Sequence, residues 1–250
     1  AIFFASMFPS DIMADAGKKN ARYFIFLILS ICLLVYFSAI TVSQNAKWRD
    51  GETLYSHTLK YAADSQRLHY NLGNTYREAG RLAEAEQEYK IAIELDPSLQ
   101  SAYFNLGLTY IKIGNLDEAI ANFKKSIELE PDHYKSYNAL GLAYKDKGML
   151  EDAIKQYKKS LKLNPNQAEA HNNLGDAYFA EKMYKEAEEE FRKALAVDSR
   201  YTEAWNNLGV TLIMQGRKEE AVGAWKKSLE INPDQPRIED YISRNLNQGG

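Results

Sequence analysis

The sequence has a single cysteine, Cys32, among its 250 residues. One cysteine excludes an intrachain disulfide framework and a cysteine-rich zinc site. The chain also lacks an excess of basic residues, since its formal net charge is −3. Nucleic-acid-binding domains normally carry a basic face, so we expect no nucleic-acid partner. No Asn-x-Ser/Thr triplet occurs, and the sequence therefore offers no acceptor for N-linked glycosylation.

The signatures of an enzyme active site are absent as well. No His-Glu-x-x-His motif, phosphate-binding loop or nucleophile elbow occurs, and the four histidines are scattered. Paired carboxylates such as Glu151 and Asp152 fall on expected helix surfaces, without a pocket to raise a pKa. We therefore predict that this chain is not itself an enzyme and holds no cofactor or metal.

What the sequence does contain is a repeat with a fixed period. A Leu-Gly pair recurs every 34 residues, at 72/73, 106/107, 140/141, 174/175 and 208/209. With Gln66 as position 1, position 8 is always Gly, position 20 always Ala, and position 24 always a large aromatic residue. Four of the six prolines fall at position 32, where the fourth unit has Ser199. A period of this length indicates a repeat architecture.

These recurring positions resemble the tetratricopeptide repeat, a helix-turn-helix unit of this length. The resemblance implies an all-α fold, a right-handed α-solenoid in which each repeat packs on its neighbours. It covers five repeats, at 66–99, 100–133, 134–167, 168–201 and 202–235.

Glycine recurs within each repeat in two structural roles. Gly73 and its equivalents remove a side chain where two helices approach closely, at a helix-propensity cost of about 1 kcal/mol relative to Ala. Gly80 and its equivalents end the first helix by adopting a left-handed conformation. The fourth repeat has Lys182 there, which leaves its turn without the usual residue.

A hydrophobic run, residues 23–42, precedes the array and contains no charge over twenty residues. A helix of this length spans about 30 Å, the hydrocarbon thickness of a bilayer. We predict a transmembrane helix here, with the lipid bilayer as a partner; a buried core helix and a cleaved signal peptide are the alternatives. Lys18, Lys19 and Arg22 precede the run, which by the positive-inside rule favours a single-pass membrane chain with extracytoplasmic repeats.

Three further segments flank the run and the array. Residues 1–22 start without a Met, and either a preceding hydrophobic helix cut short or an upstream translation before Met13 explains them. Residues 43–65 keep the register of a second helix, so we predict a linker and half repeat. Residues 236–250 are predicted to form a capping helix and a loose tail, because solenoid ends need a cap.

In tetratricopeptide repeats the first helices line a concave groove that binds extended peptides or partner helices, and the resemblance implies a protein or peptide ligand here. Groove-facing position 6 is asparagine in four units, at Asn71, Asn105, Asn173 and Asn207. Asparagine is a mediocre helix-interior residue, whereas its amide offers both a donor and an acceptor to a peptide. The row resembles the asparagine ladder of O-GlcNAc transferase, although Ala139 interrupts it. A consensus residue that caps or solvates locally is the alternative.

A carboxylate clamp, which holds a peptide C-terminus in chaperone-binding members of the family, is matched only in part. Asn74, Asn105 and Lys135 fit its pattern, but Tyr70 and Ala139 replace two cations that it needs. Their loss removes most of the charge-assisted binding. The remaining candidate residues of the groove are Asn172, Asn206, Lys112 and Lys145.

Two functions follow from these features. The first is a membrane-anchored interaction scaffold that recruits a protein partner in its groove. The second rests on the order of apolar helix, half repeat and array, which resembles transmembrane O-mannosyltransferases. In that case the array is the C-terminal region of a polytopic glycosyltransferase and presents acceptor polypeptides to a catalytic domain upstream.

Overall fold

The computed structural model describes residues 31–38, 40 and 51–246. These residues are helical with short connections, and the described part of the chain contains no β-strand. The chain divides into two compact units, residues 1–63 and 64–250. In the first unit, residues 31–38 and 40 are helical, and α2 spans Gly51–Leu59.

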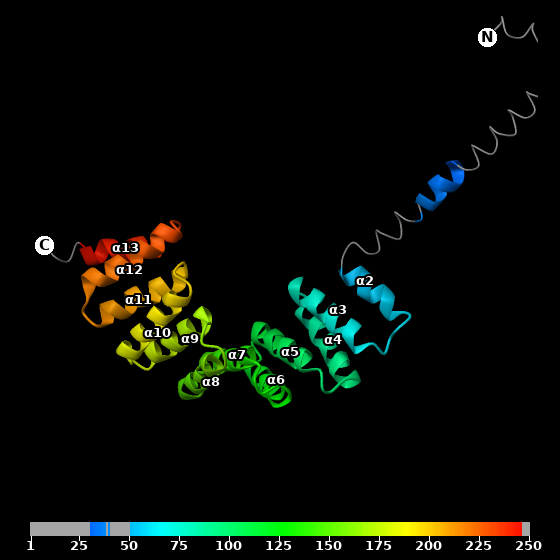
Figure 1. Ribbon diagram of the computed structural model, residues 1–250, viewed down its shortest axis with the longest axis horizontal. Helices are drawn as coiled ribbons and strands as arrows, with labels where there is room; N and C mark the ends of the chain where they lie inside the picture. Colours follow the sequence, from blue (N-terminus) through cyan, green and yellow to red (C-terminus); the bar gives the residue numbers. More distant parts are fainter. Residues whose placement is uncertain (1–30, 39, 41–50, 247–250) are drawn as a thin grey trace, which may run out of the picture. The chain divides into compact units, whose positions relative to one another are not determined.

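The second unit is a row of antiparallel helix pairs followed by one further helix (Figure 1). The pairs are α3 (Gln66–Glu78) with α4 (Leu82–Leu95), α5 (Gln100–Ile113) with α6 (Leu116–Leu129), α7 (Tyr134–Asp146) with α8 (Leu150–Leu163), α9 (Ala168–Ala180) with α10 (Tyr184–Val197), and α11 (Thr202–Met214) with α12 (Lys218–Ile231). The last helix is α13 (Pro236–Leu246). Each pair packs on the next, which confirms the predicted all-α solenoid.

The core of each pair is an aromatic ring of the second helix that lies against a glycine of the first. The five rings are at most 2% exposed: Tyr89, Phe123, Tyr157, Phe191 and Trp225. A Cβ atom on Gly107 would lie 2.6 Å from the ring of Phe123, closer than van der Waals contact allows. Burying such a ring contributes about 3 kcal/mol, so this glycine and ring together hold the pair at close range.

The turn between paired helices uses a left-handed residue in every repeat. Gly80, Gly114, Gly148 and Gly216 have φ between 76° and 86°, and Lys182 has φ of 62°. The N–H of Met183 donates to the carbonyl of Tyr178 at 2.9 Å, as the N–H of Asn115 donates to Tyr110 at 2.9 Å. The fourth repeat therefore makes the same turn with a lysine, in a conformation that disfavours side chains with a Cβ.

Helix α13 covers the end of the last repeat. Its Ile238 is 7% exposed, and the ring of Tyr241 lies 5.4 Å from that of Trp225 between centroids. An apolar helix face placed here closes the last helix pair, whose outer side no further repeat in this chain covers.

The predicted single-pass membrane chain is wrong on the evidence of the described residues. Of the run at 23–42, only residues 31–38 and 40 are described, and the rest of the predicted span lies outside them. Within the described residues no helix is long and apolar enough to cross a membrane, which takes about 20 residues. This finding overturns the membrane localisation, including the extracytoplasmic placement of the repeats, and leaves the bilayer as a partner without support. The predicted flank at 1–22 and the tail at 247–250 also lie outside the described residues.

Candidate functional site

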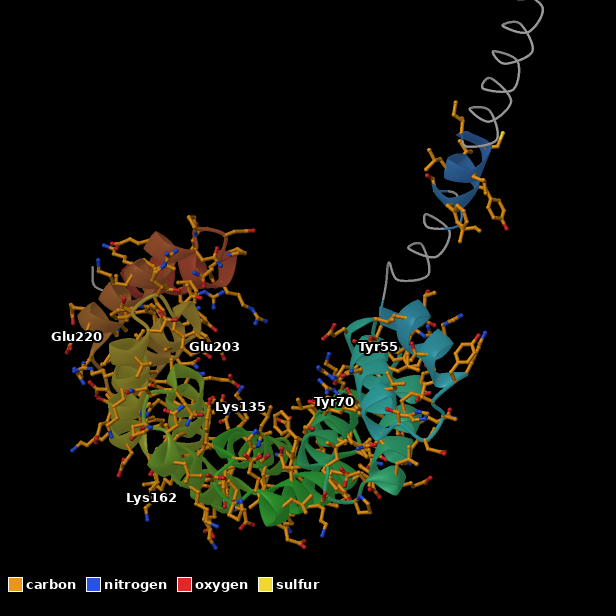
Figure 2. All side chains as sticks on the ribbon, turned by 45° about the vertical axis from the view of Figure 1, so that its right-hand side comes forward. Tyr55, Tyr70, Lys135, Lys162, Glu203 and Glu220 are labelled. Atoms are coloured by element: carbon orange, nitrogen blue, oxygen red, sulfur yellow. The ribbon has the colours of Figure 1, made fainter. Side chains whose placement is uncertain are left out.

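The first helices of the five pairs, α3, α5, α7, α9 and α11, share one side of the second unit. Figure 2 shows Tyr70, Lys135 and Glu203, which belong to first helices, on the inner side of the row of pairs. Lys162 and Glu220, which belong to second helices, lie on its outer side. We call the surface of the first helices the inner face.

Asparagine side chains cross-link neighbouring first helices along the inner face. Asn105 Nδ2 donates to the hydroxyl of Tyr70 at 3.0 Å and to Asn74 Oδ1 at 2.8 Å. Two repeats later, Asn173 Nδ2 donates to Asn138 Oδ1 at 3.3 Å. At these boundaries the side chain at position 6 of one repeat donates a hydrogen bond to the side chain at position 5 of the preceding repeat. We call these hydrogen bonds rungs.

The last rung involves two candidates at once. Asn207 Nδ2 donates to Asn172 Oδ1 at 3.1 Å, and Asn172 is only 1% exposed. The amide of Asn172 is therefore an internal partner of the array. Asn206 Nδ2 donates to Gln235 Oε1 at 2.8 Å, which ties α11 to the residue that precedes α13. Asn71 occupies position 6 of the first repeat and is half-buried.

The candidate lysines differ in their surroundings. Lys145 Nζ forms an ion pair with Asp176 Oδ2 at 2.7 Å, so its charge is already matched. Lys112 and Lys135 are exposed, and neither forms an ion pair within the part of the chain that the structure describes. They are therefore free to meet an anionic partner.

Charge is unevenly distributed along the inner face. Cations of the first three repeats lie at Arg67, Arg77, Lys112, Lys135 and Lys145, together with the anions Glu78 and Asp146. At the corresponding positions of the last two repeats the charged residues are the anions Glu169 and Glu203. These positions are thus mainly basic toward α3 and acidic toward α11, where Arg237 of α13 adds one cation.

Cavities open along this face. One of about 470 Å³ lies between α5, α7 and α9 and is lined by Phe104, Leu108, Ala139 and Leu142 together with polar residues. A second of about 410 Å³ lies between α11 and α13, where Asn206 and Asn207 meet Arg237 and Tyr241. A third of about 70 Å³ adjoins Asn207 and Asp176.

Histidines at position 4 contact carboxylates beside the rungs, which the sequence did not indicate. His171 Nδ1 lies 2.6 Å from Glu190 Oε2, and its Nε2 lies 3.0 Å from the carbonyl oxygen of Pro165. Burial alone would raise the pKa of Glu190, but hydrogen bonds from His171 and Lys193 outweigh it and hold this pKa below its ordinary value. His69 and Glu88 form the same pair at 2.6 Å in the first repeat.

Sequence reasoning also missed the acceptors at position 5. Tyr70, Asn138 and Asn172 receive the rung bonds, yet their residue types differ and no single consensus marks them. Each acceptor lies 35 residues before its donor. Comparing each asparagine at position 6 with the residue 35 positions earlier could therefore have identified the acceptors.

Family models for the tetratricopeptide repeat match the array. A model described as "TPR repeat" matches residues 73–114 and 142–182. Three models described as "Tetratricopeptide repeat" match residues 101–133, 122–155 and 166–234. Together these matches span the region from 73 to 234.

Curated relatives match a small part of their own length. The chain is 35% identical over 71 residues to the protein O-mannosyl-transferase F38B6.6 of Caenorhabditis elegans, which covers 28% of this chain and 10% of that protein. It is 32% identical over 71 residues to the human protein O-mannosyl-transferase TMTC1, covering 28% of this chain and 8% of that protein. The matched region thus spans about a tenth of the length of these relatives.

Solved structures share the fold over most of their chains. The crystal structure of MamA protein has a TM-score of 0.61 at 26% identity, covering 69% of this chain and 94% of that chain. TTC0263, a TPR protein of Thermus thermophilus, has a TM-score of 0.58 at 25% identity and covers 73% and 99%. YrrB, a TPR protein described as having an unusual peptide-binding site, has a TM-score of 0.61 at 24% identity and covers 74% and 96%.

Proposed function

We propose that this chain, which belongs to the tetratricopeptide-repeat family, is a protein-interaction scaffold that binds an extended polypeptide segment or helix along its inner face. The row of rung asparagines carries this proposal. An extended backbone presents donors and acceptors at regular intervals, and the rungs present amides once per repeat.

The rungs leave part of each amide available to a ligand. Asn105, Asn173 and Asn207 each use Nδ2 as an internal donor, while no hydrogen bond among the described residues occupies their Oδ1 atoms. The three side chains are half-buried. A half-buried amide oxygen favours a donor, and a backbone N–H of a bound polypeptide supplies one.

Selection from a random peptide library displayed on phage tests the proposal. The wild-type chain is compared with the triple variant Asn105→Ala, Asn173→Ala, Asn207→Ala and with Asn122→Ala, whose amide lies on the second helix α6 and donates to the carbonyl of Glu118. We expect peptides selected on the wild type to lose most of their binding to the triple variant and to keep it on Asn122→Ala. Circular dichroism and thermal melting confirm that the triple variant stays folded. Equal binding to a folded triple variant would refute the use of the rungs.

A second candidate function is supported by the partial similarity to the two protein O-mannosyl-transferases. In this case the inner face presents acceptor polypeptides to a glycosyltransferase whose catalytic part lies outside this chain. O-mannosylation modifies side-chain hydroxyls, so the selected peptides should then be enriched in Ser and Thr. Selected peptides without that enrichment would favour the general scaffold.

A further inference from the structure

The row of rungs is interrupted once, between the second and third repeats. At the other junctions, a position-6 asparagine donates to a polar atom at position 5 of the preceding repeat. At this junction position 6 is Ala139 and position 5 is Phe104, so both members of the pair are apolar. These two differences from the other repeats are consistent with each other, because an asparagine at position 139 would find no hydrogen-bond acceptor in the side chain of Phe104.

Position 9 is also apolar in these two repeats. It is Asn74 in the first repeat and Asp176 in the fourth, but Leu108, Leu142 and Val210 in the second, third and fifth. These two leucines line the same cavity of about 470 Å³ as Phe104 and Ala139. Four apolar side chains therefore line this cavity together, and its volume lies in the range that small ligand pockets use.

The rim of this cavity carries one charge of each sign. Lys135, at the start of α7, and Glu169, at the start of α9, both line the cavity. Both side chains are exposed, and they form no ion pair with each other in the described residues. Their order follows the charges along the inner face, because Glu203, which Figure 2 labels, lies on the α11 side of this cavity.

We propose that the cavity at Phe104 and Ala139 is an anchor subsite for one large apolar side chain of the bound polypeptide. In the bound polypeptide, a carboxylate on one side of the apolar anchor residue faces Lys135. A cationic side chain on the other side of the anchor faces Glu169. This subsite rests on the proposed function of the inner face. It fixes where along the array the ligand sits, since burying one large side chain in a central pocket commonly dominates an interface.

The charges also fix the direction in which a ligand lies. A polypeptide with acidic and basic residues on opposite sides of its apolar anchor meets complementary charge at both ends of the inner face. The opposite placement brings like charges together at both ends, which opposes binding. A ligand with charges of both signs on each side of its anchor gains no net electrostatic attraction at either end of the inner face.

Fluorescence anisotropy with three synthetic peptides tests the subsite. The first has acidic residues, a central Leu and then lysines, with serines between them. The second has Ser in place of the Leu, and the third keeps the composition of the first but alternates its charges. We expect the wild type to bind the first peptide about tenfold or more tightly than the second, and more tightly than the third.

Two variants replace the apolar lining of the cavity by polar side chains that other repeats already carry at the same positions, and we call them the polar variants. Phe104→Asn combined with Ala139→Asn copies the rung of Asn138 and Asn173. Because Phe104 also lies against Phe123 and His133, Leu108→Asn is the second variant, and it leaves that packing in place. Both should reduce the ratio of the first two affinities toward one. Lys135→Glu should weaken the first peptide, whereas Lys162→Glu on the outer side should not.

The outcomes separate the subsite from the proposed function. If the wild type binds the Leu and Ser peptides equally, or both polar variants keep the full ratio, the subsite is overturned while binding on the inner face stands. If neither peptide binds the wild type, the subsite is also overturned, and the library selection alone decides the proposed function. Loss of the ratio in the polar variants, with the Ser peptide still bound, supports the subsite.

Discussion

The hydroxyl of Tyr89 donates to Asn74 Oδ1 across 2.7 Å. Tyr157 occupies the same position of the third repeat, but Leu142 stands where Asn74 stands in the first. The Tyr157 hydroxyl is therefore buried without a hydrogen-bond partner among the described residues. Burial raises the pKa of both hydroxyls, to about 12 for Tyr89.

This difference predicts opposite effects of the same substitution. Tyr157→Phe should leave the free energy of unfolding unchanged or raise it by about 1 kcal/mol, because it removes an unsatisfied buried hydroxyl. Tyr89→Phe should lower it by about 1 kcal/mol, because it removes a satisfied one. Urea denaturation of both variants beside the wild type measures the effect. Equal destabilisation by the two substitutions would contradict the assignment.

The glycine at position 8 should not tolerate a methyl group. A Cβ on Gly141 would lie 2.6 Å from Cε1 of Tyr157, so Gly141→Ala should destabilise the array by about 1–3 kcal/mol through overpacking. At Gly223, on the exposed side of α12, an added Cβ would meet no atom within 4 Å. Gly223→Ala is the matched control and should stabilise the chain by about 0.5–1 kcal/mol. Thermal melting distinguishes the two, and a stabilising Gly141→Ala would show that the ring yields.

The lysine turn of the fourth repeat should improve with glycine. Lys182 has φ of 62°, a conformation that costs an L-residue about 1–2 kcal/mol. Lys182→Gly should therefore raise the free energy of unfolding by about 1 kcal/mol, less a part for the greater freedom of glycine in the unfolded chain. The neighbouring Glu181 has φ of −78°, so Glu181→Gly should give no such gain. Denaturant titration of both variants tests whether the left-handed backbone is the cause.

Acid should weaken the fourth repeat through Glu190. Its pKa lies below the ordinary value of 4.5, because hydrogen bonds from His171 and Lys193 outweigh the effect of burial. A lowered folded-state pKa means that its stabilisation is present above about pH 4.5 and is lost as pH falls through the folded value. The stability difference between the wild type and Glu190→Gln should therefore shrink as pH falls through this window. Urea denaturation at a series of pH values checks it, and a constant difference would argue against this role.

The repeat fold was predictable because its determinants are local and periodic. Gly107 and Phe123 recur at fixed positions, and their packing inside one repeat follows from the spacing alone. Lys182 shows the same principle, since its repeat makes the family's turn without the family's glycine. The membrane prediction was wrong because it rested on the composition of a single run, which no repeated pattern supports. No described helix has the length and apolar character that a bilayer requires.

The sequence by itself determined the repeat, the helix pairs and the row of position-6 asparagines, because each depends on residues close together along the chain. Only the tertiary structure decided what those asparagines contact. Asn105 meets Tyr70 across a repeat boundary, and Phe104 and Ala139 line one cavity at the one junction without a rung. These pairings depend on how one repeat stacks on the next, so spacing within a repeat does not reveal them. The cavity that Lys135 and Glu169 also line likewise forms only where neighbouring repeats stack.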